Sequence, residues 1–287
     1  MNAAVVQLTS TDDVQANLAR IREQVAAAVG VGAELVVLPE NFAFFGDETK
    51  KRSIAESLDG PSHGPIAQAL AELASKHGID LIAGGMPEKS GEVARPFNTS
   101  VHFAPNGALV SRYRKMHLFD VSLADGTTLR ESNATSPGLG VGLTEVNGVK
   151  LGMTICYDLR FPELFRLLEG EGARIITVPS AFTVTTGKDH WHVLLRARAI
   201  ENQVYVLAAA QHGTHPGGRS TYGKSVIVDP WGDVVAQARE GESFALARLD
   251  FPYLERVRSS LPCLDHKRIK TNTSSAIKSS RDVSKLD

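Results

Sequence analysis

The sequence is poor in cysteine, with Cys156 and Cys263 alone among 287 residues. Two cysteines so far apart do not form the disulfide framework of a small secreted domain, so we expect a cytoplasmic protein whose cysteines are thiols. Met1 to Ser10 places no basic residue ahead of its short apolar stretch, unlike a signal peptide. The longest apolar run, Val25 to Ala33, is far shorter than the ~20 residues that span a bilayer, so we expect no membrane partner.

A surplus of charge is also missing. The 31 Lys and Arg residues balance 32 Asp and Glu, for a net charge of -1. Nucleic-acid partners normally require a clustered basic face, so we expect none and favour a small-molecule ligand. A hydrophobic content of 43% is typical of a globular protein. Residues 1–270 are expected to form one domain, whereas Thr271 to Asp287 has little to bury and is expected to be a flexible tail or, alternatively, an oligomer contact.

Short apolar runs and helical spacings alternate along the chain. Apolar residues three and four apart predict helices over Val14 to Val25 and Ile66 to Leu73. Pro65 and Gly78 flank the second helix as expected at helix ends. The predicted buried strands are Ala4 to Leu8, Leu35 to Leu38, Asp80 to Ala83, Ser100 to Phe103, Val149 to Ile155, Ile175 to Val178, Val204 to Ala209 and Ser225 to Val228. The pattern predicts an α/β or α+β fold.

Two segment types occur twice, in the same order. The stretch from Gly32 matches the stretch from Gly172 at an offset of 140 residues (172 − 32), and the stretch from Ser100 matches the stretch from Ser225 at an offset of 125 (225 − 100). The repeats indicate two related halves, with two sheets face to face and helices outside; chance similarity of strand-turn patterns is the alternative.

The two halves differ directly after a shared proline. The first half has Glu40 there and the second has Ser180. A carboxylate at the end of a buried strand is costly unless it is paired or used, so Glu40 is a candidate functional group.

A second candidate is Cys156, which follows the predicted strand Val149 to Ile155 and precedes Pro162, a residue that can open a helix. A strand-turn-helix junction presents one side chain beside free backbone N–H groups, as a nucleophile requires. A free cysteine is also commonly a small buried apolar residue. Lys115 would favour the thiolate of a nearby cysteine, although a lysine in a basic run is usually solvated.

Three motifs together resemble the nitrilase superfamily of carbon-nitrogen hydrolases: Leu38 to Asn41, Arg114 to Asp120 and Ile155 to Glu163. The resemblance covers Ala3 to Lys267 and is greatest to the Nit branch, whose members include deaminated glutathione amidase and ω-amidase. It implies an α+β fold, a four-layer α-β-β-α sandwich, which agrees with the two halves inferred from the repeats.

The resemblance also implies roles for individual residues. Glu40 is the expected general base, Lys115 the transition-state stabiliser and Cys156 the nucleophile, while Glu131 holds Lys115 or a water molecule, or else ties down a surface turn. Such groups would let the thiol attack a carboxamide while Lys115 and the Tyr157 N–H stabilise the oxyanion. Glu40 would then protonate the departing ammonia and activate water.

We therefore expect a cofactor-independent amidase that converts a small carboxamide, such as deaminated glutathione or a similar ω-amide, to a carboxylate and ammonia. Such substrates carry carboxylates, so a basic residue should line the pocket. Phe182 and Tyr157 are expected pocket residues. The basic candidates are Arg160, Lys188, Arg196 and Arg198.

Other readings remain open from the sequence. A nitrilase or N-carbamoyl amidase would use the same three groups, although nitrilases usually have Trp-Glu or Gly-Glu where Tyr-Asp follows Cys156 here. A non-catalytic binding protein with a vestigial site and a Cys156 redox sensor are further alternatives. His190, His192, His212 and His215 lack companion ligands at metal spacing, so no metal is expected. A homodimer or higher homo-oligomer is expected.

Overall fold

The computed structural model describes residues 1–60, 63–122, 126 and 128–269. Within these residues, two mixed six-stranded sheets contain most of the strands. The first sheet consists of β1 (Asn2–Gln7), β2 (Leu35–Leu38), β3 (Asp80–Glu88), β4 (Phe97–Phe103), β5 (Leu109–Arg114) and β16 (Ser243–Arg248). The second consists of β8 (Gly142–Val146), β9 (Val149–Met153), β10 (Ile175–Thr177), β11 (Tyr205–Ala208), β14 (Val226–Val228) and β15 (Val234–Gln237).

Five α-helices, three 3₁₀ turns and two hairpins complete the described elements. The helices are α1 (Val14–Gly30), α2 (Pro65–His77), α3 (Pro162–Gly170), α4 (Val184–Asn202) and α5 (Phe251–Ser260). The 3₁₀ turns are η1 (Glu48–Ser53), η2 (Glu131–Asn133) and η3 (Cys156–Arg160). The hairpins are β6 (Asp120–Ser122) with β7 (Thr128–Arg130), and β12 (His212–Thr214) with β13 (Ser220–Tyr222).

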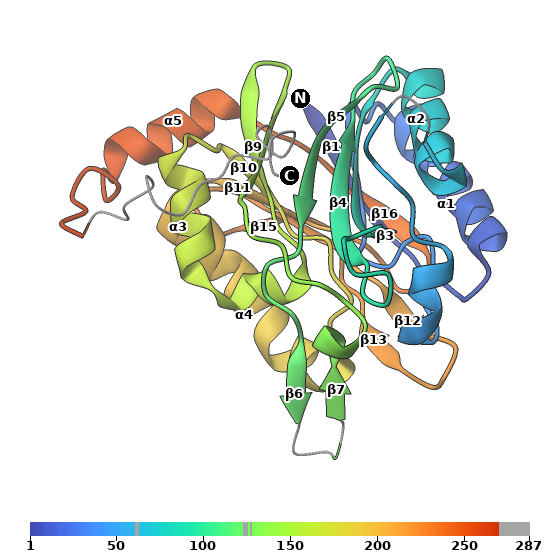
Figure 1. The fold of residues 1–287 in the computed structure, drawn as a ribbon. Coiled ribbons are helices and arrows are strands. Elements are labelled where there is room, and N and C mark those ends of the chain that lie inside the picture. Colours follow the sequence, from blue (N-terminus) through green and yellow to red (C-terminus); the bar gives the residue numbers. More distant parts are fainter. Residues whose placement is uncertain (61–62, 123–125, 127, 270–287) are drawn as a thin grey trace.

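The sheets lie face to face, with α1 and α2 on the outer side of the first and α3 and α4 on the outer side of the second (Figure 1). The predicted α-β-β-α sandwich is therefore confirmed. The predicted tail, residues 271–287, lies outside the described residues.

The two halves have the same strand order. The sheets run β16-β1-β2-β3-β4-β5 and β8-β9-β10-β11-β14-β15, each with three parallel strands followed by two antiparallel ones. Gly32 and Gly172, which match in the repeat, both have φ +95°, a conformation that favours glycine. The repeats therefore mark equivalent positions in the fold.

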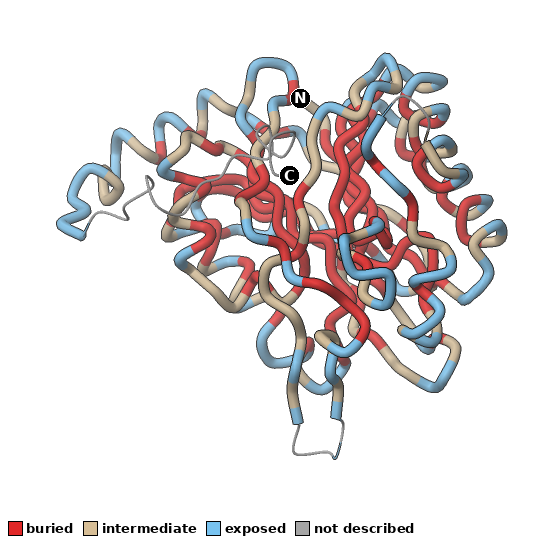
Figure 2. Tube along the Cα trace, in the orientation of Figure 1, coloured by how far each residue is buried: buried red, intermediate tan, exposed pale blue. Residues whose placement is uncertain are grey.

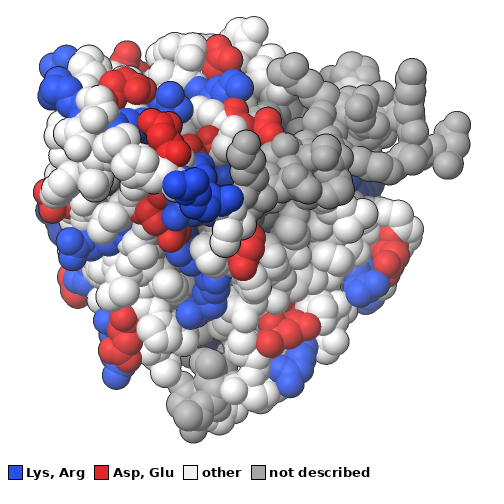
Figure 3. Space-filling view, turned by 90° about the vertical axis from the view of Figure 1, so that its left-hand side faces the viewer, with Lys and Arg blue, Asp and Glu red and all other residues white. Residues whose placement is uncertain are grey.

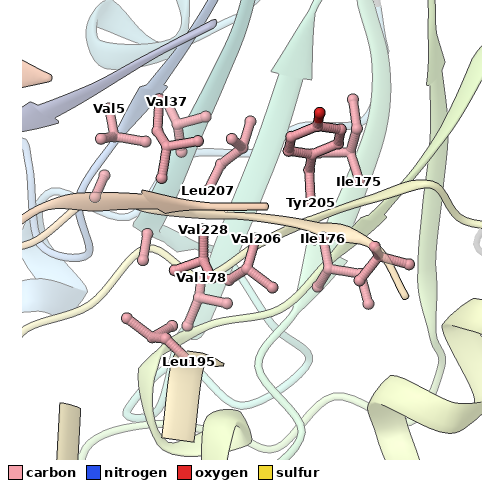
Figure 4. Close-up of a cluster of buried hydrophobic side chains, with 14 of the residues drawn as sticks. Val5, Val37, Ile175, Ile176, Val178, Leu195, Tyr205, Val206, Leu207 and Val228 are labelled. Carbon is pink, nitrogen blue, oxygen red and sulfur yellow. The ribbon is translucent and has the colours of Figure 1, made fainter. Parts of the chain in front are cut away.

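Side chains alternate across each sheet, as buried strands require. In Figure 4, Tyr205 and Leu207 point toward Val5 of the first sheet, whereas Val206 points toward Leu195 of α4. The strands are thus buried on both faces, and the buried residues concentrate in the two central layers (Figure 2). Burial of each such side chain contributes about 1.5–3 kcal/mol, which makes the sheets a rigid support for the residues at their ends.

All eight predicted strands occur, and their ends lie within two residues of the predicted ones except that β3 continues beyond Ala83 to Glu88 and β4 begins at Phe97 instead of Ser100. The helix α2 begins at Pro65 and is followed by Gly78 with φ +62°, as predicted. The strand expected over Val149 to Ile155 ends at Met153, because the chain turns into η3. Thr154 still donates its N–H to the Thr177 carbonyl at 3.1 Å, so the turn stays attached to β10.

Among the described residues, no helix combines the length and the apolar character needed to cross a membrane. On the face shown in Figure 3, Lys and Arg side chains lie among Asp and Glu side chains, so that face carries charges of both signs.

Candidate active site

The candidate site lies where several strands end at the same edge of the sandwich. Glu40 follows β2, Lys115 follows β5 and Cys156 follows β9. β5 runs in the same direction as β2 because two antiparallel steps through β4 restore the direction. A cavity of about 610 Å³, counting its open mouth, lies here. It is lined by the expected catalytic residues Glu40, Lys115, Glu131 and Cys156, by the expected pocket residues Tyr157 and Phe182, and by Arg160, one of the four basic candidates.

Glu40 is 4% exposed, and its surroundings hold both its backbone and its carboxylate. Gln211 donates to its carbonyl at 2.9 Å, and Lys115 and Asn98 donate to Oε1 at 2.8 and 3.0 Å. The equivalent residue of the second half, Ser180, instead donates its hydroxyl to the Val178 carbonyl. Among the described residues, the first of the two related halves therefore carries the carboxylate of the site, and the second does not.

Lys115 is 1% exposed and lies between two carboxylates. Its Nζ is 2.8 Å from Glu40 Oε1, and 3.0 and 2.8 Å from the two oxygens of Glu131. Burial alone would lower the pKa of Lys115, but the negative charges of Glu131 and Glu40 raise it well above its usual value. Lys115 is therefore a fixed cation.

Glu131 opens η2 and links Lys115 to the neighbouring loop. Its Oε2 accepts the Phe119 N–H at 2.7 Å in addition to the Lys115 contact. Asn98 donates to its Oε1 at 3.3 Å. These bonds fix the Glu131 carboxylate against Lys115, where it shares the donors Lys115 Nζ and Asn98 Nδ2 with Glu40.

Cys156 occupies a tight turn between β9 and η3. Its φ of +49° lies in the left-handed region, which non-glycine residues rarely adopt, and its N–H donates to the Pro179 carbonyl at 2.8 Å. Strained backbone of this kind persists only where the surroundings hold it. The turn presents the side chain to the cavity, where Cys156 is 8% exposed.

Lys115 lowers the pKa of the Cys156 thiol, as predicted, but other effects outweigh it and favour the protonated thiol. Burial and the negative charge of Glu40 raise the pKa of Cys156 well above its usual value, and the attraction of Lys115 does not offset them. Burial would also raise the pKa of Glu40, but the charge and hydrogen bond of Lys115 lower it below 4.5, aided by a hydrogen bond with Cys156. The resting site therefore pairs an ionised carboxylate with a neutral thiol.

The N–H of Tyr157 is the available backbone donor of the Cys156 turn. The neighbouring N–H groups are engaged, since Cys156 donates to the Pro179 carbonyl and Asp158 to the Ile155 carbonyl at 3.1 Å. Tyr157 lies at the start of η3, where N–H groups lack a partner within the helix. This N–H and Lys115 Nζ are two donors beside the thiol.

Arg160 is the sequence-predicted basic residue that lines the cavity. Its guanidinium lies 5.9 and 5.3 Å from the ring centres of Tyr157 and Phe182, and Nη1 is 3.3 Å from His190 Nδ1. Its contacts within the described residues are thus with His190 and two aromatic rings and not with a carboxylate, so the cation is available to an anionic group of a ligand.

The other three basic candidates do not line the cavity. Lys188 is exposed on α4. Arg196 donates to the Gly232 carbonyl at 2.6 Å. Arg198 is 6% exposed and is held by the Leu159 carbonyl and by Glu201.

Several cavity residues are absent from the sequence predictions. Lys51 is 6% exposed, donates to Asn41 Oδ1 at 2.9 Å and pairs with Glu48 at 2.6 Å. Arg219, from the β12–β13 loop, pairs with Glu48 at 3.0 Å and lies 4.8 Å from the ring centre of Phe45. In the sequence, the charges of η1 are indistinguishable from a solvated surface.

No cluster of three or more His, Cys, Asp or Glu side chains able to hold a metal ion occurs in the part of the chain that the structure describes.

Comparison with known proteins agrees with this geometry. Residues 2–259 match the family described as Carbon-nitrogen hydrolase. A deaminated glutathione amidase of Synechocystis sp. is 44% identical over 269 residues, which cover 92% of this chain and 97% of that protein. The crystal structure of Nit3 from Saccharomyces cerevisiae, a member of branch 10 of the nitrilase superfamily, is 35% identical with a TM-score of 0.85, and the match covers 94% of this chain and 97% of that one.

A second similar structure is a mutant of the amidase from Nesterenkonia sp. AN1, which carries the acetamide moiety of fluoroacetamide covalently on its active-site cysteine. It is 26% identical with a TM-score of 0.75, and the match covers 92% of this chain and 96% of that one. Together, the match over nearly the whole folded region and these relatives show that the chain belongs to the carbon-nitrogen hydrolase family.

Proposed function

We propose that this protein is an amidase that acts through a Cys156 thioester, with deaminated glutathione or a similar anionic ω-amide as substrate. The observation that carries the proposal is the buried Lys115 ammonium held between Glu40 and Glu131 beside the Cys156 thiol. A fixed cation, a base and a nucleophile at the floor of one cavity are the groups that acyl transfer from nitrogen requires.

In the first half-reaction, ionised Glu40 takes the proton from Cys156 as Sγ bonds to the amide carbon. The carbonyl oxygen becomes an oxyanion, which Lys115 Nζ and the Tyr157 N–H stabilise. At rest Lys115 Nζ contacts three carboxylate oxygens, so it donates to the oxyanion by giving up the longest of these contacts, that with Glu131 Oε1 at 3.0 Å. The C–N bond then breaks as Glu40 returns the proton to the leaving nitrogen, which leaves a thioester.

In the second half-reaction, Glu40 takes a proton from water as the water oxygen bonds to the thioester carbon. The same donors stabilise the second oxyanion. The C–S bond then breaks, Glu40 returns the proton to sulfur, and the product departs as the carboxylic acid, which loses its remaining proton to solvent. Glu40 therefore ends each half-reaction ionised, which agrees with its lowered pKa at rest.

Arg160 supports an anionic substrate. Its guanidinium is stacked near two aromatic rings, and its charge is not neutralised by a described carboxylate. We propose that it binds a substrate carboxylate, with Tyr157 and Phe182 as the apolar wall.

The decisive experiment follows both products and enzyme mass. Primary amides, an N-substituted amide such as deaminated glutathione and matched nitriles are incubated with the protein, and ammonia or released amine is assayed. We expect turnover of amides and, at short times, an acyl adduct on the intact protein that disappears in Cys156→Ala. The matched control Cys263→Ala should retain both. Turnover of nitriles alone, or amide turnover by Cys156→Ala, would contradict the proposal.

We also propose a cytoplasmic homo-oligomer in which residues 1–270 form one catalytic domain. α4 contacts the β14–β15 turn, where Arg196 donates to the Gly232 carbonyl. Exposed apolar side chains from both segments lie there: Val193 and Ile200 on α4, Trp231 in the turn, and Val234 and Val235 on β15. Light scattering of the purified protein tests this, since a monomer at micromolar concentration would contradict it.

A further inference from the structure

Asn98 is hydrogen-bonded to Glu40, Glu131 and Lys115. It lies on β4 and is 6% exposed. Its Nδ2 donates to Glu40 Oε1 at 3.0 Å and to Glu131 Oε1 at 3.3 Å, and its carbonyl accepts the backbone N–H of Lys115 at 2.8 Å. One residue therefore holds two carboxylates through its side chain and the cation through its backbone.

The contacts also select one oxygen of Glu40. Both Lys115 Nζ and Asn98 Nδ2 donate to Oε1. Oε2 is left as the oxygen that can take the thiol proton of Cys156. Rotation of the carboxylate out of this plane would break both bonds, so the two donors together hold the carboxylate in one plane and leave its second oxygen for the nucleophile.

The amide orientation is dictated by charge. Carboxylates are acceptors only, so a flipped amide would place Oδ1 against Glu40 and Glu131. In the observed orientation, Oδ1 is buried without a hydrogen-bond partner within the described residues. A buried polar atom without a partner needs an explanation. Here Oδ1 of Asn98 stays unpaired because the amide is oriented so that Nδ2 donates to two carboxylates.

The backbone beside Asn98 is shaped for this arrangement. Gly85 in β3 has φ +81°, and a Cβ there would lie 2.8 Å from Asn98 Oδ1 and 2.9 Å from Glu40 Cγ. A side chain at this position would push both groups, so the glycine allows Asn98 and Glu40 to approach each other.

We propose that Asn98 is a positioning residue that holds Glu40 with Oε2 toward Cys156 and separates the Glu40 and Glu131 carboxylates by a neutral donor. This inference rests on the proposed amidase function, in which Glu40 takes the thiol proton. The effect of Asn98 on the reactivity of Cys156 can nevertheless be measured without a substrate. The titratable groups around Glu40 are Lys115, the Cys156 thiol and, at longer range, Lys51, together with Glu131, which shares the donors Lys115 Nζ and Asn98 Nδ2 with Glu40.

The test measures the rate of Cys156 alkylation by iodoacetamide against pH, in a Cys263→Ser background that leaves a single thiol. Asn98→Asp nearly preserves shape but places a third carboxylate between two others. Such a cluster retains an extra proton to higher pH, so the acid limb of the alkylation profile should move up by about one pH unit or more. Asn98→Ala adds no charge and frees the Glu40 carboxylate, so kcat on an amide should fall about 10²-fold with KM nearly unchanged.

The control is Asn202→Asp, which puts a charge at a fully buried asparagine on α4 whose Nδ2 donates to the Arg198 carbonyl. It should lower thermal stability without moving the alkylation profile. A folded Asn98→Asp with the wild-type profile, or a profile change equal to that of Asn202→Asp, would overturn the proposal. If both Asn98 variants fail to fold while Asn202→Asp folds, Asn98 is a core residue and the proposal is equally overturned.

Failure of the amidase proposal looks different. In that case the wild-type protein hydrolyses no amide, while the alkylation profiles still report whether Asn98 controls the proton transfer from Cys156 to Glu40.

Discussion

Asp158 accepts two hydrogen bonds from His117, one from ring Nδ1 at 2.7 Å and one from the backbone N–H at 3.2 Å. His117 lies two residues after Lys115, and Asp158 lies two residues after Cys156. The pair therefore joins the loop that carries the cation to the turn that carries the nucleophile. Asp158 is fully buried and also accepts the Tyr113 hydroxyl and the Ile155 N–H, both at 2.8 Å.

Substitution of Asp158 by alanine should affect both folding and activity. It leaves several buried donors without an acceptor, so we expect a loss of about 3 kcal/mol in the free energy of unfolding. Displacement of Lys115 from Cys156 should lower kcat/KM about 10²-fold. Urea unfolding and amide hydrolysis measure the two effects. Asp229→Asn, in a turn remote from the cavity, is the control and should cost stability alone. Full activity of folded Asp158→Ala would refute the linkage.

Replacement of Lys115 by methionine removes a charge while keeping an apolar stem. The oxyanion loses one donor, so kcat should fall about 10²- to 10³-fold. The pKa of Glu40 should rise, because burial raises it and Lys115 is the main opposing charge. A base is useful only when ionised, so the acid limb of residual activity should move to higher pH. Lys150→Met on β9 is the control. An unmoved limb would show that Lys115 does not control the ionisation of Glu40.

The pH dependence of stability should report the ion pairs of Glu48. Burial raises its pKa, but Lys51 and Arg219 outweigh burial and lower the pKa from 4.5 to about 2. Because the folded-state pKa is depressed, this stabilisation is present above pH 4.5 and is lost as the pH falls toward 2. Since the pairs are partly exposed, Glu48→Gln should cost roughly 1 kcal/mol at pH 6 and almost nothing near pH 2.

Urea midpoints between pH 2 and pH 6 test this expectation. Exposed Glu145 on β8 gives the matched control, since Glu145→Gln should follow the wild-type curve. If the difference between Glu48→Gln and wild type stays constant over this range, the carboxyl is not the source of the pH dependence.

Glu40, Lys115 and Cys156 could be predicted from the sequence because each lies in a local motif at the end of a strand. The directions of the three strands then bring these ends to one edge of the sandwich. The partners of these residues are harder to predict. Asn98 is 58 residues from Glu40 in sequence and lies within an ordinary strand pattern. Arg219 is 171 residues from Glu48, and their contact exists only after the β12–β13 loop packs over η1. Neither contact leaves a local signal.

Burial explains two further differences between the structure and what the sequence predicts. The buried face of α4 includes Gly187, Arg198 and Asn202, so its apolar periodicity is interrupted and the sequence does not predict that helix. The sequence also indicates that Lys115 lies near Cys156, but not that burial and Glu40 together outweigh it. The sign of a pKa shift depends on which charges surround a group after folding, and that is a property of the packed site.

Arg160 should determine the preference for anionic substrates. Arg160→Gln removes a cation that no described carboxylate neutralises, so KM for an amide bearing a carboxylate should rise about 10- to 100-fold, as expected for loss of a hydrogen bond to a charged group. KM for a neutral amide should change little, because that substrate has no group for the guanidinium to bind. The ratio of kcat/KM for paired anionic and neutral amides measures the effect and cancels any general loss of activity.

Arg130 is the matched control for Arg160, because it also lines the cavity but its Nη1 is bound by the carbonyls of Val121 and Leu129 at 2.7 and 2.9 Å. Arg130→Gln should either leave kcat/KM unchanged or lower it equally for the anionic and the neutral amide. Equal losses for both amides in Arg160→Gln would mean that the arginine supports the cavity wall through Tyr157 and Phe182 and does not select the substrate. A selective loss confined to Arg130→Gln would place the substrate carboxylate at Arg130, the last residue of β7.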